Sequence, residues 1–218
     1  FHRWLCEGEI EAVNPRNHGT KTAALYRLDI PAGGEFVLKL ELARRDKKFA
    51  EFDSERFDKI FALRIEEADQ FYAETIPGAL SDEQKNVARQ AYAGLVWTKQ
   101  FYHLVVEDWL IGDPYEMPPP AERRSGRNSQ WLHVFAKDIL SMPDKWEYPW
   151  FAAWDLAFHM VPYARIDPYF AKQQLTVLLR EWYMHPNGQL AAYEWEFGDV
   201  NPPVHAWAVW RVYKICGT

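Results

Sequence analysis

From residue 55 onwards, the sequence alternates long segments of helical periodicity with strong turn signals. Over residues 55–75, apolar side chains recur every three or four positions, the spacing of an amphipathic helix, and a Pro-Gly pair ends the pattern. Ser81, with Gln84 three residues later, has the pattern of a capping box and predicts a second long helix running to about Val106. The short apolar stretch 131–140 indicates a further turn of helix. Long paired helices joined by short turns predict a mainly α fold.

Two more helical patterns follow in the last third of the chain. A helix is expected over residues 150–161, because Pro162 lacks the N–H that would continue it. Asp167 followed by Pro168 combines a helix N-cap with proline at the first helical position. Residues 204–212 resume an amphipathic helical pattern after a rigid Pro-Pro pair.

The first 44 residues have a different pattern. Residues 22–30 and 35–42 alternate apolar and polar side chains around the turn sequence 31–34, which predicts an antiparallel hairpin. We expect this hairpin to be the last strands of a β domain, with residues 1–44 in that domain and residues 45–218 in a helical one. Because the chain begins without Met, it is also expected to be an internal fragment of a longer protein.

Charge and cysteine content narrow the classes of function. The net charge is −6 with a pI near 5.7, and the basic residues are scattered, so nucleic acid is not an expected partner. No apolar run approaches the length of a membrane span. Cys6 and Cys216 lie at opposite ends of the chain and suggest neither a disulfide framework nor a metal site. We therefore predict no metal and no cofactor.

The stretch 142–159 gathers aromatic side chains around a single carboxylate, Asp155. Of the 11 Trp residues, all but Trp4 lie at or after Trp97, so the two halves of the chain differ in role. Flat aromatic faces beside an acid suit a sugar, which has apolar ring faces and hydroxyl edges. A Trp-rich core helix with a solvated or capping Asp is the alternative. The aromatic residues of this stretch include Trp146, Tyr148, Trp150, Phe151 and Trp154.

Three short motifs follow one another in a characteristic order: Trp154-Asp155, then the turn 186–188 (Pro-Asn-Gly), then 201–203 (Asn-Pro-Pro) at a helix start. This order resembles the (α/α)6-barrel glycoside hydrolases, most closely glycoside hydrolase family 63 and more distantly the trehalases. That family includes processing α-glucosidases and mannosylglycerate-type hydrolases. Trehalases carry Tyr-x-Trp-Asp and later Gln-Pro-Pro. This sequence departs from them at Ala152 and Ala153, and at Asn201, which puts trehalose in doubt as the substrate.

The resemblance implies a partial (α/α)6 barrel, or α-toroid, preceded by the end of a β-sandwich domain. It also implies an inverting mechanism, in which two carboxyl groups act on opposite faces of the sugar. By the same resemblance, Asp155 binds sugar hydroxyls in the −1 subsite, and both catalytic carboxylates lie beyond Thr218. Asp155 as the general acid, or as a structural cap, remains an alternative. If the catalytic carboxylates instead lay within this chain, Asp155 and Glu196 would be the candidates.

Further substrate contacts are predicted around Asp155. Trp150 and Trp154 either stack on the sugar or belong to the core, and His205 either donates to a hydroxyl or is structural. His159, one helical turn after Asp155, is expected to form a hydrogen bond with it. Glu194 and Glu196 would share one side of an extended segment, with Trp195 on the other. The full predicted set is Tyr148, Trp150, Phe151, Trp154, Asp155, Trp195, Glu196, Asn201 and His205.

Three functions are compatible with the sequence. The first is a fragment of an inverting glycoside hydrolase that acts on α-glucosides or related glycosides, inactive alone, with an oligosaccharide or small glycoside as its ligand. The second is a non-catalytic carbohydrate-binding helical domain, and the third is a helical scaffold whose aromatic residues are all core. The loop residues Arg123, Arg124 and Arg127 are either solvated or suited to a carboxylate-bearing aglycone.

Overall fold

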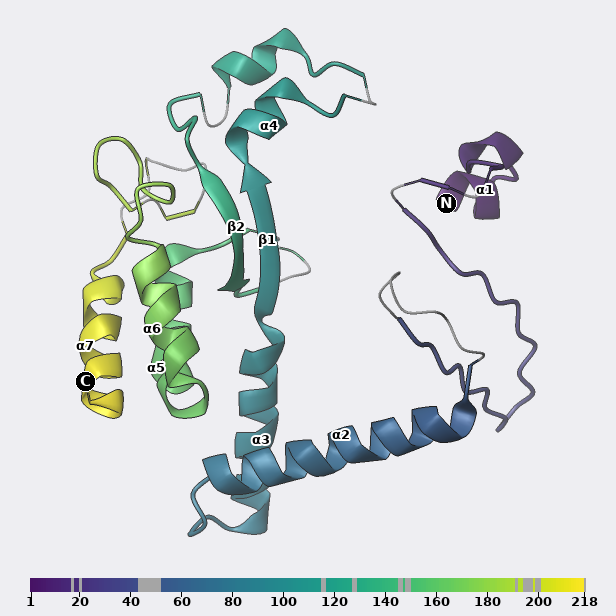
Figure 1. Cartoon of the computed structure of the whole chain (residues 1–218), viewed down its shortest axis with the longest axis horizontal. Helices are drawn as coiled ribbons and strands as arrows, with labels where there is room; N and C mark the ends of the chain where they lie inside the picture. Colours follow the sequence, from purple (N-terminus) through teal and green to yellow (C-terminus); the bar gives the residue numbers. More distant parts are fainter. Residues whose placement is uncertain are drawn as a thin grey trace. The chain divides into compact units, whose positions relative to one another are not determined.

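The computed structural model of the chain is mainly helical, as the sequence predicts, with a small two-stranded sheet (Figure 1). The structure describes residues 1–16, 18–19, 21–42, 52–114, 117–126, 129–144, 147, 150–190, 192–193, 198 and 201–217. Its helices are α1 (His2–Cys6), α2 (Ser54–Thr75), α3 (Asp82–Trp97), α4 (Val106–Ile111), α5 (Ala153–Ile166), α6 (Pro168–Val177) and α7 (Val204–Cys216), with short 3-10 helices at Ile10–Ala12 and Ala121–Ser125. The strands are β1 (Lys99–Val105) and β2 (Phe135–Ser141).

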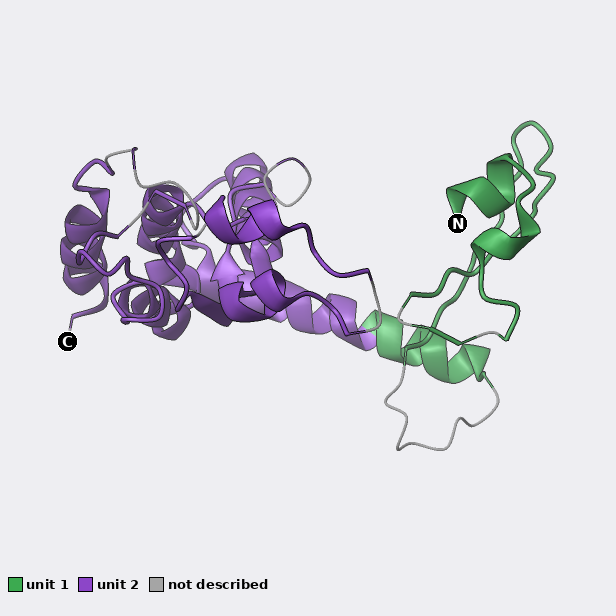
Figure 2. Ribbon diagram, turned by 90° about the horizontal axis from the view of Figure 1, so that it is seen from above, with its two compact units in different colours: residues 1–62 green, residues 63–218 purple. Residues whose placement is uncertain are grey.

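The chain divides into two compact units, residues 1–62 and residues 63–218 (Figure 2). In the first unit, residues 21–42 are described throughout and contain neither helix nor strand, so the predicted strands are not formed. The turn between them is present, because Gly34 N–H donates to the Pro31 carbonyl at 2.9 Å. A lone hairpin is stable only when its apolar face packs against something, and here Leu40 is 65% exposed.

The predicted domain boundary near residue 44 lies outside the described residues, and the assignment of the first 44 residues to a β domain stays a prediction.

The helix start signals act as predicted. At α3, the Ser81 hydroxyl accepts from Gln84 N–H and the Gln84 side chain accepts from Ser81 N–H, which completes the capping box. At α6, the Asp167 carboxylate accepts from Phe170 N–H at 3.0 Å, with Pro168 at the first helical position. The helices predicted over residues 55–75, from Pro168 onwards and over residues 204–212 are also confirmed, as α2, α6 and α7.

The sheet corrects two helix predictions. Helix α3 ends at Trp97 rather than near Val106, and the residues that follow form β1. The stretch 131–140 contributes β2 rather than a helical turn, in antiparallel register with Lys99 opposite Ser141. Pairing between distant segments overrides the ambiguous local pattern of a short apolar run. One face of the sheet, including Ala136 and Leu140, is buried in the core.

The two edges of the sheet differ. On the outer edge of β2, the Gln174 side chain donates to the Ile139 carbonyl at 2.8 Å and accepts from Ser141 N–H at 2.9 Å. The N–H and C=O groups of odd-numbered β2 residues thus point away from β1. Phe101 and His103 lie opposite odd-numbered residues of β2, so their own N–H and C=O groups point away from β2. Among the described residues, these β1 groups have no hydrogen-bond partner.

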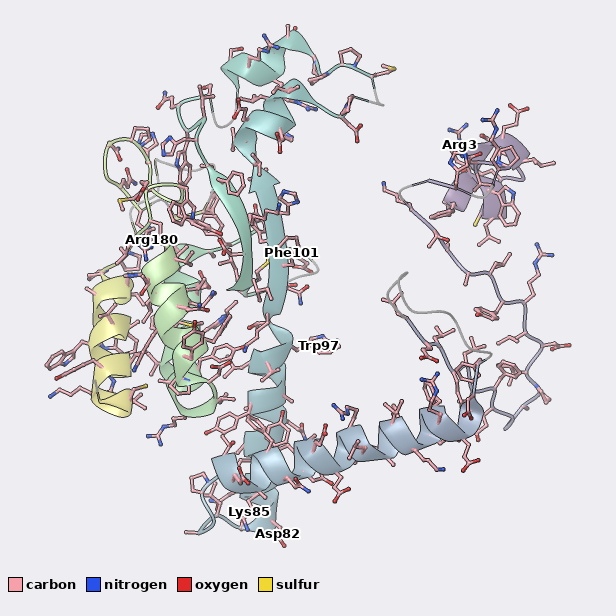
Figure 3. The ribbon with its side chains drawn as sticks, in the orientation of Figure 1. Arg3, Asp82, Lys85, Trp97, Phe101 and Arg180 are labelled. Carbon is pink, nitrogen blue, oxygen red and sulfur yellow. The ribbon has the colours of Figure 1, made fainter. Side chains whose placement is uncertain are left out.

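Helices α5, α6 and α7 pack side by side next to the sheet and enclose the core (Figure 1). Helix α5 begins at Ala153 and continues through Pro162 to Ile166, so Pro162 does not end it as predicted. Its apolar neighbours hold the helix together despite the missing N–H. The largest fully buried side chains are Trp131, Tyr163, Tyr183, Phe151, Leu140, Leu156, Met160, Leu178, Val106 and Val134. In contrast, Trp97 projects from the end of α3 on the side away from α5 and α6 (Figure 3).

Candidate functional site

The first turn of α5 presents the carboxylate singled out from the sequence. Ala152, the N-cap residue, forms an isolated bridge with Tyr193, and Ala153 N–H donates to the Ala192 carbonyl at 2.8 Å. These backbone contacts fix where the helix begins. Asp155 lies in the first turn, not at the N-cap, and no side chain in the described part of the chain caps α5. The capping interpretation of Asp155 is therefore not supported, although a first-turn carboxylate favours the helix dipole.

Asp155 is half-buried and accepts no hydrogen bond from any described residue. The predicted hydrogen bond from His159 is not formed, since the His159 Nδ1 atom instead lies 2.8 Å from the Ser141 hydroxyl. Burial lowers the pKa of His159 below its usual range, and the nearby Asp155 charge opposes this shift. His159 is therefore neutral at pH 7, and no side chain of the described residues donates a hydrogen bond to the Asp155 oxygens.

A chain of hydroxyl groups extends from His159 into the core. The Ser141 hydroxyl lies 2.7 Å from the Thr98 hydroxyl, and Thr98 donates to the Leu95 carbonyl at 2.6 Å. The Tyr163 hydroxyl also donates to the Leu95 carbonyl. This chain connects α5 to the end of β2 and to the junction of α3 and β1. Ser141 was not predicted as a site residue, because its strand was not predicted.

Three aromatic side chains line the exposed surface beside Asp155, and we call them the aromatic ladder: Trp154, Phe158 and Trp207. The ring centroids of Trp154 and Phe158 are 6.0 Å apart, and those of Phe158 and Trp207 are 5.6 Å apart. The three side chains are 40%, 44% and 44% exposed, respectively. Trp154 is thus at the surface and not in the core. Phe158 could have been found from helical spacing, because it lies four residues after Trp154 on α5. Trp207 could not, because it comes from α7 and only the packing of the two helices brings it to Phe158.

The other aromatic residues before Asp155 have different positions. Phe151 is 1% exposed and packs edge-on against Tyr102 and Tyr183, with centroids 5.8 and 5.6 Å away. This burial favours a core role over a sugar contact for Phe151. Trp150 is half-buried, and its ring lies 6.2 Å from that of Tyr193.

Asn201 and His205 lie at the start of α7, and each has one buried acceptor atom. Asn201 donates from Nδ2 to the Leu190 carbonyl, and its Oδ1 is buried without a partner among the described residues. His205 Nε2 lies 3.0 Å from the Leu175 carbonyl, so Nε2 carries the proton and the buried Nδ1 is a lone-pair acceptor. Burial lowers the pKa of His205, and the Leu175 carbonyl opposes that shift.

The turn that precedes this region is formed as predicted, because Gly188 N–H donates to the His185 carbonyl at 2.8 Å and Gly188 has a φ of 83°.

Several predicted residues lie outside the described part of the chain: Tyr148, Glu194, Trp195, Glu196 and Arg127. The pairing of Asp155 with Glu196 as substitute catalytic groups therefore stays a prediction. Of the arginine loop, Arg123 donates to the Trp109 carbonyl at 2.9 Å, and its guanidinium lies 4.8 Å from the centre of the Trp109 ring. Arg124 lines a separate cavity of about 560 Å³ together with His133. Arg123 is thus engaged by the protein itself.

No group of three His, Cys, Asp or Glu side chains that could hold a metal ion occurs among the residues that the structure describes. Within the same ranges, no helix is both long enough and apolar enough to cross a membrane.

Comparison with known proteins relates the chain to a glycoside hydrolase family and to a yeast protein. Residues 148–218 match the family described as the mannosylglycerate hydrolase MGH1-like glycoside hydrolase domain. The matched range contains Asp155, the aromatic ladder and the start of α7, and it relates this part of the chain to glycoside hydrolases. The uncharacterized protein YMR196W of Saccharomyces cerevisiae is 53% identical over 224 residues, which cover 99% of this chain and 21% of that protein. The chain thus spans about a fifth of the length of the curated relative it matches. No solved structure matches.

Proposed function

We propose that this chain forms a sugar-binding wall of a glycoside hydrolase that acts on α-glucosides or related α-glycosides. The observation that carries the proposal is the exposed aromatic ladder beside Asp155, whose half-buried carboxylate has no hydrogen-bond partner among the described residues. The family match over residues 148–218 supports the same class of enzyme.

The chemistry of the wall suits a neutral sugar ring. A carboxylate has only acceptor atoms, and it can take hydrogen bonds from two neighbouring hydroxyl groups. The rings of Trp154 and Phe158 offer apolar contact to the C–H face of a pyranose, as aromatic side chains do in ligand sites. Asp155 would then bind the hydroxyls of the sugar in the −1 subsite and orient the ring for cleavage. Asn201 and His205 are also proposed to lie close to the sugar, by the resemblance alone, because their acceptor atoms that lack a partner among the described residues are buried.

The reaction itself needs two further carboxyl groups. In an inverting enzyme, one protonates the leaving oxygen and the other activates water from the opposite face, about 6.5–9.5 Å away. We propose that Asp155 belongs to neither role, and that substrate binding is its contribution. A non-catalytic carbohydrate-binding domain is the second candidate, because the ladder and Asp155 serve recognition equally well in it.

Hydrolysis kinetics of the full-length natural protein test the proposal. The substrates are mannosylglycerate and the 4-nitrophenyl α-glucoside and α-mannoside. Because a hydrogen bond to a charged acceptor contributes about 1.5–3 kcal/mol, Asp155→Ala should raise KM about 10- to 100-fold and leave measurable turnover. Glu181→Gln changes an exposed carboxylate outside the site and should leave KM unchanged.

Each alternative gives a different pattern. If Asp155 were the general acid, the variant would lose turnover of mannosylglycerate but keep it for the activated 4-nitrophenyl glycosides. If the wild-type protein binds these sugars and cleaves none, the binding-domain alternative is correct. If it neither binds nor cleaves any of them, the proposed function is wrong.

A further inference from the structure

The hydroxyl chain behind His159 fixes which of its ring nitrogens carries the proton. Thr98 donates its one hydroxyl hydrogen to the Leu95 carbonyl, so at 2.7 Å from Ser141 it must accept. Ser141 therefore donates to Thr98 and has no hydrogen left for His159. At 2.8 Å, the Ser141 oxygen must accept from an Nδ1–H of His159. Neutral His159 is thus held as the Nδ1–H tautomer.

In this tautomer, the second ring nitrogen, Nε2, is a hydrogen-bond acceptor. Nε2 has no partner among the described residues, and it is not among their fully buried polar atoms. Asp155 lies one turn earlier on the same side of α5, and the two side chains do not form an ion pair. Two separate acceptors therefore line the exposed side of α5, beside the aromatic ladder.

Ser141 is itself held in place. Its N–H donates to Gln174, which is 3% exposed and comes from α6. The orientation of the His159 ring thus rests on groups from β2, α6 and the α3–β1 junction, and not on a mobile side chain. Such a fixed acceptor is suited to recognition, because little conformational entropy is lost when a ligand binds.

We propose that His159 is a ligand-contacting residue of the same site, whose Nε2 accepts a hydrogen bond from a sugar hydroxyl different from those bound by Asp155. This inference rests on the proposed function and defines its ligand more closely. Since both groups only accept, the ring bound here must be neutral and must carry free hydroxyls at the contacted positions. A phosphate or carboxylate at those positions would face the Asp155 charge and a lone pair, and would be rejected.

Two substitutions of His159 separate a ligand contact from a structural role. In His159→Asn, the side-chain amide occupies the place of Nδ1 and keeps the bond to Ser141, but nothing occupies the place of Nε2. In His159→Gln, the amide oxygen reaches the place of Nε2 and can accept from a ligand, but the bond to Ser141 is lost. The binding of methyl α-glucoside and methyl α-mannoside to the full-length natural protein is measured by calorimetry, alongside the melting temperature of each variant.

We expect His159→Asn to weaken sugar binding about 3- to 10-fold at a near wild-type melting temperature, the effect of one lost hydrogen bond. His159→Gln should stay within about 2-fold of wild-type affinity even if its melting temperature falls. The reverse order, with Asn binding normally and Gln binding poorly, would overturn the inference and leave His159 a structural residue.

Monodeoxy sugars provide a second test that needs no substitution of His159. Each monodeoxy sugar is bound to the wild-type protein and to Asp155→Ala. At least one missing hydroxyl should weaken binding about 3- to 10-fold in both proteins, because His159 and not Asp155 contacts it. If every hydroxyl whose removal weakens binding to the wild-type protein has no effect on binding to Asp155→Ala, then Asp155 alone binds the sugar. In that case the inference fails while the proposed function stands. If neither methyl glycoside binds the wild-type protein, both fail.

Discussion

Gln174→Met should destabilise the fold more than its conservative shape suggests. Methionine has the same unbranched length as glutamine but no polar atoms at its end. The substitution removes both hydrogen bonds that Gln174 makes to β2, at 2.8 Å to the Ile139 carbonyl and at 2.9 Å from Ser141 N–H. Gln174 is also connected to the candidate site, because Ser141, which it binds, forms the hydrogen bond with His159.

The magnitude follows from the two backbone groups that lose their partner. A buried polar group left without a hydrogen bond costs about 1–3 kcal/mol, so two such groups cost about 2–6 kcal/mol. Burying an apolar methionine end at this 3% exposed position offsets about 1 kcal/mol of that cost. The remainder is about 1–5 kcal/mol, and partial relaxation at the part-buried Ile139 carbonyl lowers the upper limit, so the free energy of unfolding should fall by about 1–4 kcal/mol.

Urea unfolding monitored by circular dichroism measures this change. With a slope of about 2 kcal/mol per molar urea, the midpoint should fall by about 0.5–2 M. Gln173→Met is the matched control, because Gln173 is exposed and its side chain bonds, among the described residues, only to the Tyr169 hydroxyl. It should change stability by less than about 0.5 kcal/mol. If the two variants unfold at the same urea concentration, Gln174 does not hold the edge of β2 as argued.

Three other outcomes are expected. Asp167→Ala removes the α6 cap and the ion pair with Lys99 and should cost about 1–2 kcal/mol in urea unfolding, whereas Asp167→Asn keeps the cap and should cost about half as much; equal losses would contradict a capping role. Phe151→Ala should cost about 3–5 kcal/mol as a core truncation, and a loss below about 1 kcal/mol would place Phe151 at the surface. Burial lowers the pKa of both His159 and His205, so at these two positions the folded protein binds fewer protons than the unfolded chain. Their contribution to the free energy of unfolding is fully present above a pH of about 6.5 and decreases below it. The urea midpoint should therefore fall as the pH drops from 7.5 to 5.5, and a rise would contradict this reasoning.

The sequence predicted those parts of the fold that are specified by adjacent residues. The capping box at Ser81, the Asp167-Pro168 start of α6 and the Pro-Asn-Gly turn before α7 are each formed by residues within a few positions of one another. These signals act through local backbone geometry, so they survive in the structure whatever packs around them.

The sheet could not be predicted in the same way. The segment Lys99–Val105 becomes a strand because residues 135–141, 30 to 42 positions later, provide its hydrogen-bond partners. Its short apolar run fits a helix equally well when viewed alone. Likewise, Pro162 would end an isolated helix, but burial of the residues on either side keeps α5 continuous to Ile166.

The same limit applies to the candidate site. Asp155 and Trp154 were identifiable because the aromatic stretch is unusual in composition, and the structure leaves both accessible. The expected partner of His159 was its neighbour on the helix, Asp155, whereas the actual partner is Ser141, 18 residues earlier on β2. No spacing rule connects those two positions, so only the fold could show that the imidazole is turned towards the sheet.

The closed edge of β2 and the open edge of β1 also predict how amide protons exchange with solvent. The Ser141 amide, bonded to buried Gln174, should exchange slowly although its strand lies at an edge, while the outward amides of Phe101 and His103 should exchange quickly. Local opening of the sheet should thus begin with β1. Ser141 would stay attached to α6 during such openings, and the imidazole of His159 would keep its orientation through fluctuations that loosen β1.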